Sequence, residues 1–177
     1  MGGLTLIGCT TTTDTTTAQA PAITTPSATP TLTERQQAIQ QATDTALTML
    51  TRFDTLTREG QPASGLKALK PLMTADFFAS EVAANETLRL TGPTSFEIEQ
   101  VKRAKIAEDG NSTVRVLLCK DMSKAKLIDT STNEVIYDPA ERPKRFLVDI
   151  TLVTDKTGNW RVESGTAPTT KGEVTKC

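Results

Sequence analysis

The sequence predicts an α+β domain in which amphipathic helices in the first half pack on a curved antiparallel sheet built by the second half. Apolar residues recur at three- and four-residue spacing over residues 34–59, as on one face of a helix. After Pro93 they alternate with polar residues in several runs, which turn-forming residues separate. With 177 residues, of which 37% are hydrophobic and 4% aromatic, the chain suits one domain with a modest core and an attached polar segment.

The first helix is expected to span residues 34–59, about seven turns. Thr33 has a hydroxyl side chain of the kind that favours an N-cap, and Gly60 follows the last turn as a typical helix terminator. The expected buried face consists of Ile39, Ala42, Ala46, Leu50, Phe53 and Leu56.

A loop is expected next, over residues 61–65, followed by a short helical piece at 66–69. Residues 74–88 again show helical spacing of apolar side chains, and Gly92 and Pro93 stop the pattern. We therefore expect a second substantial helix there.

The strands begin with a long one over residues 96–106, whose alternation slips near Gln100 as at a β-bulge. A hairpin turn at 109–111 leads to a strand over 114–118. A second hairpin is expected from residues 125–129 to 135–138, and a third around a turn at 156–159. Its first strand alternates Phe146, Val148, Ile150 and Leu152 on one face, and its second begins at Trp160.

The first residues carry a signal of a different kind. Leu6, Ile7, Gly8 and Cys9 resemble the lipobox of bacterial lipoproteins, in which a peptidase cuts before the cysteine and the cysteine carries acyl chains. The resemblance implies that residues 1–8 are a partial lipoprotein signal and that Cys9 is lipidated. Such chains would hold a protein durably on a membrane. The alternative is an accidental apolar run beside a free thiol.

The expected signal peptide is short, because only eight residues precede Cys9 and none of them is basic. Either translation starts upstream of Met1 or the chain is a trimmed form of a longer precursor, and we favour the first. N-myristoylation does not fit, because Leu6 stands where that motif has Ser or Thr.

Residues 9–33 are expected to be a lipid-anchored, disordered tether. They consist mostly of Thr, Ala and Pro, and Asp14 is their only charged residue. Such a stretch cannot bury enough apolar surface to offset the entropy lost on ordering. Residues 34–177 are then the folded domain.

Two further cysteines, Cys119 and Cys177, are expected to form a disulfide, since a chain exported from the cytosol meets an oxidising compartment. The alternative is a pair of unrelated free thiols. A zinc or redox site is not expected, because the sequence has no CxxC motif and no histidine.

Taken together, these elements resemble the NTF2-like (cystatin-like) fold, a cone formed by a long helix on a meander of strands. More narrowly, the chain is similar to small exported lipoproteins of actinobacteria, some of which their phages encode. The shared pattern is a C-x-D-x-S run from Cys119 to Ser123, a W-R-V run at Trp160 and the terminal Cys177. The resemblance implies a protein anchored on the extracytoplasmic face of the cell membrane.

No catalytic residue, metal ligand or cofactor site is assigned. Enzymes of this fold, such as ketosteroid isomerase and polyketide cyclases, pair a buried Asp base with a Tyr or Asp donor. Tyr137 lies at an expected hairpin edge, Asp149 on the outer face of its strand, and Asp121 where it would cap a turn. These three form no recognisable acid–base pair.

The formal net charge of −1 does not favour nucleic-acid binding. Six basic residues in and near the expected strands allow two interpretations. They form either a basic patch that faces anionic headgroups or wall polymers, or an ordinary solvated face of the sheet. These are Lys102, Arg103, Lys105, Lys120, Lys124 and Lys126.

The function expected from these observations is a membrane-anchored binding module of the cell envelope. Its partner would be an envelope or phage protein, or an apolar molecule held inside the cone. One alternative is a phage-encoded lipoprotein that excludes superinfecting phage, and another is an enzyme of the isomerase–cyclase type.

Overall fold

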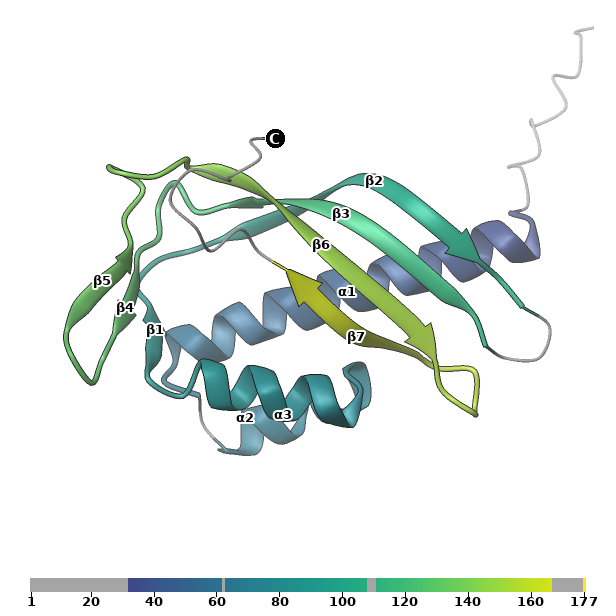
Figure 1. The fold of residues 1–177 in the computed structure, drawn as a ribbon, viewed down its shortest axis with the longest axis horizontal. Helices are drawn as coiled ribbons and strands as arrows, with labels where there is room; N and C mark the ends of the chain where they lie inside the picture. Colours follow the sequence, from purple (N-terminus) through teal and green to yellow (C-terminus); the bar gives the residue numbers. More distant parts are fainter. Residues whose placement is uncertain (1–31, 62, 108–110, 167–176) are drawn as a thin grey trace, which may run out of the picture. The chain divides into compact units, whose positions relative to one another are not determined.

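A computed structural model describes residues 32–61, 63–107, 111–166 and 177, with the backbone alone for Ala63. Cys9, most of the expected tether and part of the turn at 109–111 lie outside these ranges. Within them, the chain is an α+β domain of helices packed on antiparallel sheets, as the sequence predicts (Figure 1).

The first helix, α1 (Glu34–Arg58), has nearly the predicted bounds. Thr33 is its N-cap and forms a capping box with Gln36, in which each side chain bonds the backbone N–H of the other residue. Gly60 follows the C-cap with φ of 80°, a left-handed conformation that glycine adopts without steric cost.

The loop predicted at 61–65 is wrong in part, because a short helix, α2 (Ala63–Lys67), begins there. A Cβ at Gly65 would lie 2.1 Å from the Leu56 side chain, so the glycine allows α2 to approach α1 closely. A 3₁₀ turn, η1 (Lys70–Leu72), follows.

The helix predicted at 74–88 is shorter in the structure. It forms α3 (Ala75–Ala84), with Thr74 as N-cap and Asn85 as C-cap. The chain then enters a strand, β1 (Leu88–Leu90), which pairs with residues far along the sequence. This long-range pairing outweighs the helical spacing of the local sequence.

The strands form two antiparallel sheets rather than the single sheet predicted. The four-stranded sheet has the order β2 (Ser95–Lys105), β3 (Thr113–Asp121), β6 (Arg145–Thr154) and β7 (Trp160–Thr166). The three-stranded sheet has the order β1, β4 (Leu127–Asp129) and β5 (Glu134–Tyr137). The bulge predicted near Gln100 is confirmed, because the β2–β3 register shifts there.

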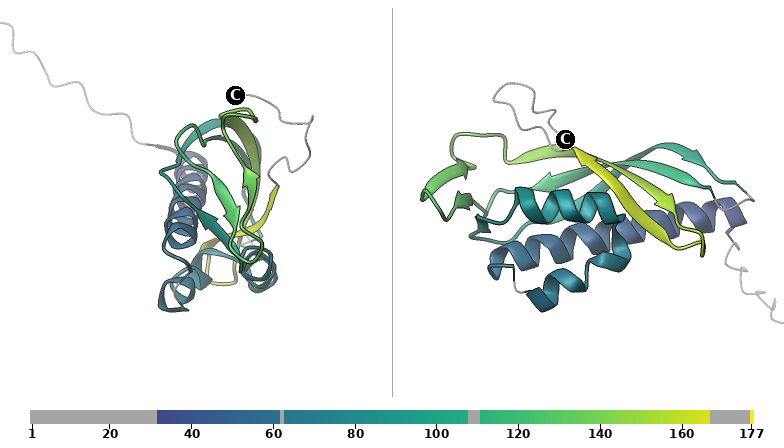
Figure 2. Two further views of the ribbon diagram at one scale, coloured as in Figure 1. Left: turned by 90° about the vertical axis from the view of Figure 1, so that its left-hand side faces the viewer. Right: turned by 60° about the horizontal axis from the view of Figure 1, so that its bottom comes forward.

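The helices cover one side of the four-stranded sheet. α1 runs across it and contacts β7, β2, β3 and β6, and α3 packs against β7 (Figures 1 and 2). The three-stranded sheet lies at the C-terminal end of α1, which contacts β1. None of the helices in the described ranges has the length and apolar character needed to cross a membrane.

The core lies between α1 and the four-stranded sheet. On β6 the predicted alternation is confirmed, because Phe146, Val148, Ile150 and Leu152 are all buried. Asp149 points to the other side, where Arg115 binds it through two hydrogen bonds of 2.7 Å. Ala42 and Ala46 of α1 have no exposed surface, so helix and sheet are in direct contact at this level.

A disulfide joins Cys119 to Cys177, the pairing that the sequence favours, with their Cα atoms 5.8 Å apart. Cys119 lies on β3 and is 1% exposed, next to Arg145, whose Nε lies 3.2 Å from its sulfur. The bond closes a loop across 58 positions of the sequence.

Removal of this bond should lower the stability of the domain. For a loop of this length, the chain-entropy treatment gives about 4 kcal/mol as an upper figure. We expect Cys177→Ser to unfold at lower guanidinium concentration than the oxidised wild type. Wild type treated with reductant is the control and should match the variant. If reductant leaves the wild-type transition unchanged, the disulfide does not contribute to stability.

Candidate functional site

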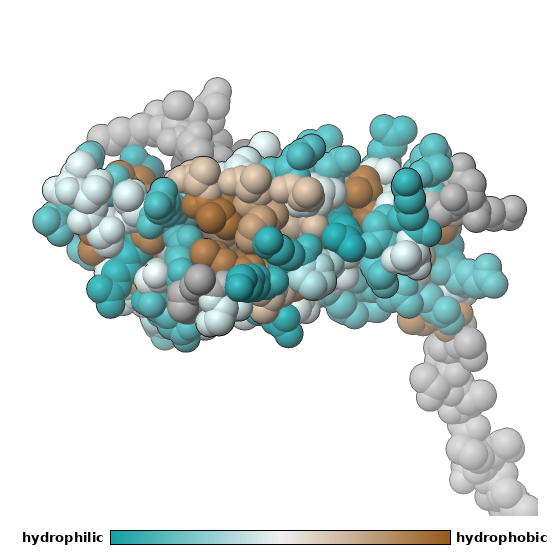
Figure 3. Space-filling view, turned by 90° about the horizontal axis from the view of Figure 1, so that it is seen from below, coloured by the Kyte–Doolittle hydropathy of each residue, from teal (hydrophilic) through white to brown (hydrophobic). Residues whose placement is uncertain are grey.

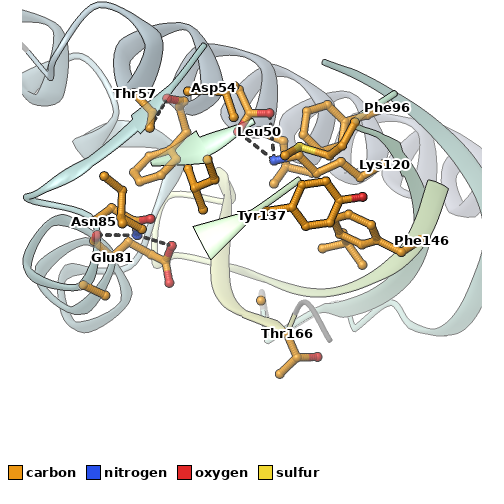
Figure 4. Close-up of a pocket in the computed structure, with 18 of the residues that line it drawn as sticks. Leu50, Asp54, Thr57, Glu81, Asn85, Phe96, Lys120, Tyr137, Phe146 and Thr166 are labelled. Atoms are coloured by element: carbon orange, nitrogen blue, oxygen red, sulfur yellow. Dashed lines mark hydrogen bonds and ion pairs between the residues drawn. The ribbon is translucent and has the colours of Figure 1, made fainter. Parts of the chain in front are cut away.

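The described residues line a cavity of about 630 Å³ between the helices and the two sheets (Figure 4). Known small-molecule sites range from roughly 300 to 1,000 Å³, so its size is typical. Most of its lining is apolar or aromatic, from Met49, Leu50, Phe53, Phe77, Ala84, Leu88, Leu90, Phe96, Met122, Leu127, Ile136, Phe146, Val148 and Ile150.

One wall of the cavity is α3. Its lining residues are Phe77, Glu81, Ala84 and, at its C-cap, Asn85. Because these residues are four, three and one positions apart, they lie on a single face of the helix. None of the residues of α3 is fully buried, although most are apolar. Its inner face therefore meets the core only in part, through Phe77 and Phe78, and otherwise borders the cavity. On its outer side, apolar side chains form a band bordered by hydrophilic ones (Figure 3).

The opposite wall is the C-terminal half of α1, where Leu50, Phe53, Asp54 and Thr57 lie on adjoining faces of the helix. The Thr57 hydroxyl donates to the Phe53 carbonyl at 2.9 Å, so it is satisfied within the helix. These side chains are longer than the alanines nearer the N-terminus, which pack directly on the sheet.

An ion pair crosses the cavity wall between α1 and β3. The Lys120 ammonium lies 2.8 Å from the nearer Asp54 carboxylate oxygen, and the Thr94 hydroxyl donates to the same carboxylate at 2.6 Å. The Lys120 ammonium also lies 5.1 Å from the centre of the Phe96 ring. The two side chains are only 17% and 13% exposed, so this pair is largely withdrawn from water.

The position of Lys120 argues against the basic patch considered from the sequence. Lys120 points into the cavity rather than to the outer face of the sheet, because it continues the inward alternation of Val116 and Leu118. Lys102 and Lys126 bind Asp149 and Asp138 at 3.5 and 2.6 Å, respectively. These lysines are therefore dispersed and paired with carboxylates.

Glu81 differs from the other acidic groups of the cavity. Its carboxylate accepts one hydrogen bond, from the Asn85 side-chain amide at 3.3 Å, and no basic side chain in the described ranges forms an ion pair with it. Partial burial raises the pKa of Glu81 above its ordinary value, and the Asn85 hydrogen bond opposes this only in part. The carboxylate points into the cavity from α3 (Figure 4).

Tyr137 brings an aromatic ring and a hydroxyl to the cavity from β5. The hydroxyl donates to the Pro143 carbonyl, and burial raises its pKa. The centre of the Phe146 ring lies 5.8 Å from the centre of the Tyr137 ring. The Arg142 guanidinium lies 6.0 Å from the centre of the Tyr137 ring.

The described residues do not assemble the acid–base pair of the isomerase–cyclase enzymes. Asp149 is on the outer face, bound to Arg115, which together with Lys102 lowers the pKa of its carboxyl. Asp121 caps a turn as predicted, since its carboxylate accepts from the Ser123 N–H at 2.7 Å, which lowers its pKa. The Tyr137 hydroxyl is already committed to Pro143.

Sequence analysis does not assign three polar groups to the cavity, Asp54, Glu81 and Lys120, although the sequence contains a signal for each. Asp54 lies four residues after Leu50 on the predicted inner face of the first helix. Glu81 lies four residues after Phe77, and Lys120 two after Leu118. Charge alone assigns such residues to the surface, whereas spacing assigns them to the inner faces.

Comparison with known proteins finds no matching protein family and no curated relative. Among solved structures, a periplasmic fragment of TraM is similar in backbone, with 14% sequence identity and a TM-score of 0.42. The match covers 71% of this chain and 93% of the fragment. A similarity of this degree carries no inference about function.

The Asp54–Lys120 pair predicts an asymmetry between single and double substitutions. Asp54→Ala leaves a withdrawn ammonium without its carboxylate, which should lower the free energy of unfolding by about 3 kcal/mol. Replacing both, as Asp54→Leu with Lys120→Met, should cost less, because no uncompensated charge remains.

Urea unfolding of the two variants measures the difference. Equal losses for the single and double variants, or a single loss below about 0.5 kcal/mol, would mean that water screens the pair as it does at an open surface.

Proposed function

We propose that this protein is a lipid-anchored binding module of the cell envelope, with an NTF2-like cone whose cavity holds an apolar small molecule. Cys9 would fix it in the outer leaflet of the cell membrane, and residues 9–33 would hold the domain away from the headgroups.

The observation that carries this proposal is the open inner face of α3. A helix stabilises a fold by burying its apolar face, yet this one presents Phe77 and Ala84 to a cavity of about 630 Å³. An apolar ligand would supply the missing contacts. Each buried methylene contributes about 0.8 kcal/mol, so even a short hydrocarbon chain gives useful affinity.

Two observations support export of the protein from the cytosol. The lipobox resemblance ends at Cys9, and the Thr-, Ala- and Pro-rich stretch directly after it suits a tether. The Cys119–Cys177 disulfide fits an oxidising compartment outside the cytosol.

Filling the cavity should abolish ligand binding. We expect Leu50→Trp, whose ring would occupy the space beside Phe53, to reduce the binding of the neutral fluorescent dye Nile red by at least about tenfold. Thr48→Trp is the matched control, because it adds the same ring to the exposed side of α1. Both are made in the full chain, with circular dichroism to confirm folding. Equal dye binding by both variants would contradict the cavity as the site.

Lipid attachment is tested separately in a bacterial host that processes lipoproteins. The chain, with an upstream signal sequence, should incorporate labelled palmitate and fractionate with membranes, whereas Cys9→Ala should do neither. Cys177→Ala is the control for other cysteines and should remain labelled. Equal labelling of wild type and Cys9→Ala would refute the anchor and leave the cavity result untouched.

A further inference from the structure

Resting on the proposed function, the choice among apolar molecules depends on more than the size of the cavity. Hydrocarbon contacts alone do not distinguish a fatty acid from an alcohol or an amine of the same length. The polar groups that remain without partners inside the cavity make that distinction.

Most polar groups of the lining are already satisfied. Asp54 and Lys120 neutralise each other, and the hydroxyls of Thr57 and Tyr137 donate to backbone carbonyls. The Arg142 guanidinium has the ring of Tyr137 as its neighbour, a favourable site for a cation. Asp54, Lys120, Thr57 and Tyr137 therefore need no ligand, whereas the Arg142 side chain forms no ion pair or hydrogen bond with a described residue.

The Glu81–Asn85 pair is different, because it offers acceptors and no donor. Both hydrogens of the Asn85 side-chain amide are committed to Glu81, one to its backbone carbonyl at 2.8 Å and one to its carboxylate at 3.3 Å. The Asn85 amide oxygen and most of the carboxylate's accepting capacity thus remain unused among the described residues. The complementary group is a donor that carries positive charge.

We propose that the cavity binds a cationic amphiphile, an apolar chain or ring system that carries a primary ammonium group, and that Glu81 and Asn85 receive this ammonium. A primary ammonium has three N–H donors, enough to bond the carboxylate and the Asn85 oxygen together. Its charge pairs with the partly desolvated carboxylate, and its apolar body lies along Phe77, Leu50 and Phe53.

The opposite headgroup is disfavoured at this end of the cavity. A carboxylate or phosphate beside Glu81 would place two like charges in a poorly hydrated space, which costs free energy that no described neighbour offsets. An anionic amphiphile would instead have to place its head at Arg142. The two headgroups therefore identify different residues, which makes the assignment testable.

The experiment compares three ligands of one chain length, dodecylammonium, dodecanol and dodecanoate, each below its micelle threshold. They displace Nile red from the full chain, with Cys9→Ala in every variant so that no attached acyl chain competes. For the parent chain we expect dodecylammonium to bind about tenfold or more tightly than dodecanol, and dodecanoate more weakly than dodecanol.

Glu81→Gln keeps the shape of the side chain and removes its charge. It should bring dodecylammonium to within about threefold of dodecanol and leave dodecanol unchanged, which shows that the fold and the apolar site are intact. Glu86→Gln is the matched control, because Glu86 is exposed and does not line the cavity. It should keep the full ammonium preference.

Four results would overturn the inference: dodecanoate binding at least as tightly as dodecylammonium, no ammonium preference in the parent chain, an ammonium preference that survives Glu81→Gln, or one that Glu86→Gln also removes. A dodecanoate preference lost in Arg142→Gln would assign the headgroup to Arg142. If dodecanol and Nile red bind without any ammonium preference, only the charge assignment fails. If neither neutral compound binds, the proposed cavity function fails as well.

Discussion

The packing of α1 on the four-stranded sheet determines where the domain is solid and where it is hollow. Near its N-terminal half the contact is made through Ala42 and Ala46, which are completely buried. A helix buried through such short side chains has to lie close to the sheet. Toward its C-terminal half, Leu50 and Phe53 face the cavity instead. The space between helix and sheet thus opens in the direction of β1 and the three-stranded sheet.

The charged side chains that line this space differ in whether an opposite charge offsets the free energy of their desolvation. Asp54 and Lys120 are carried by different elements, yet they meet at 2.8 Å, and Thr94 adds a hydrogen bond to the same carboxylate. Glu81 has no comparable partner among the described residues, and partial burial raises its pKa. A carboxylate in such a setting destabilises the ligand-free fold when it is ionised.

Much of the fold follows from local sequence. The Thr33 cap and Gly60 place the ends of the first helix, and the alternation from Phe146 to Leu152 identifies the buried face of its strand. The strand β1 could not be predicted, because it begins where the helical pattern of residues 74–88 ends and its three residues become a strand only through pairing with β4. The cavity is a similar case, since a helical face looks the same in sequence whether it meets a core or a void. The inward position of Lys120, by contrast, can be predicted from its spacing, because it lies two residues after Leu118 on the same strand.

The same geometry bears on how α3 responds to a ligand. It packs against β7, where Gly165 leaves room for the Phe77 ring, and Phe77 and Phe78 are partly buried against the core. The Lys70 ammonium also lies 5.4 Å from the Phe78 ring. A helix with so few fully buried side chains belongs to the least stable part of a domain, since local opening costs little where few apolar contacts are lost. A molecule seated against Phe77 would add contacts that are absent from the empty state, and its binding free energy would then also stabilise α3. Ligand entry and ordering of this wall are in that case one event.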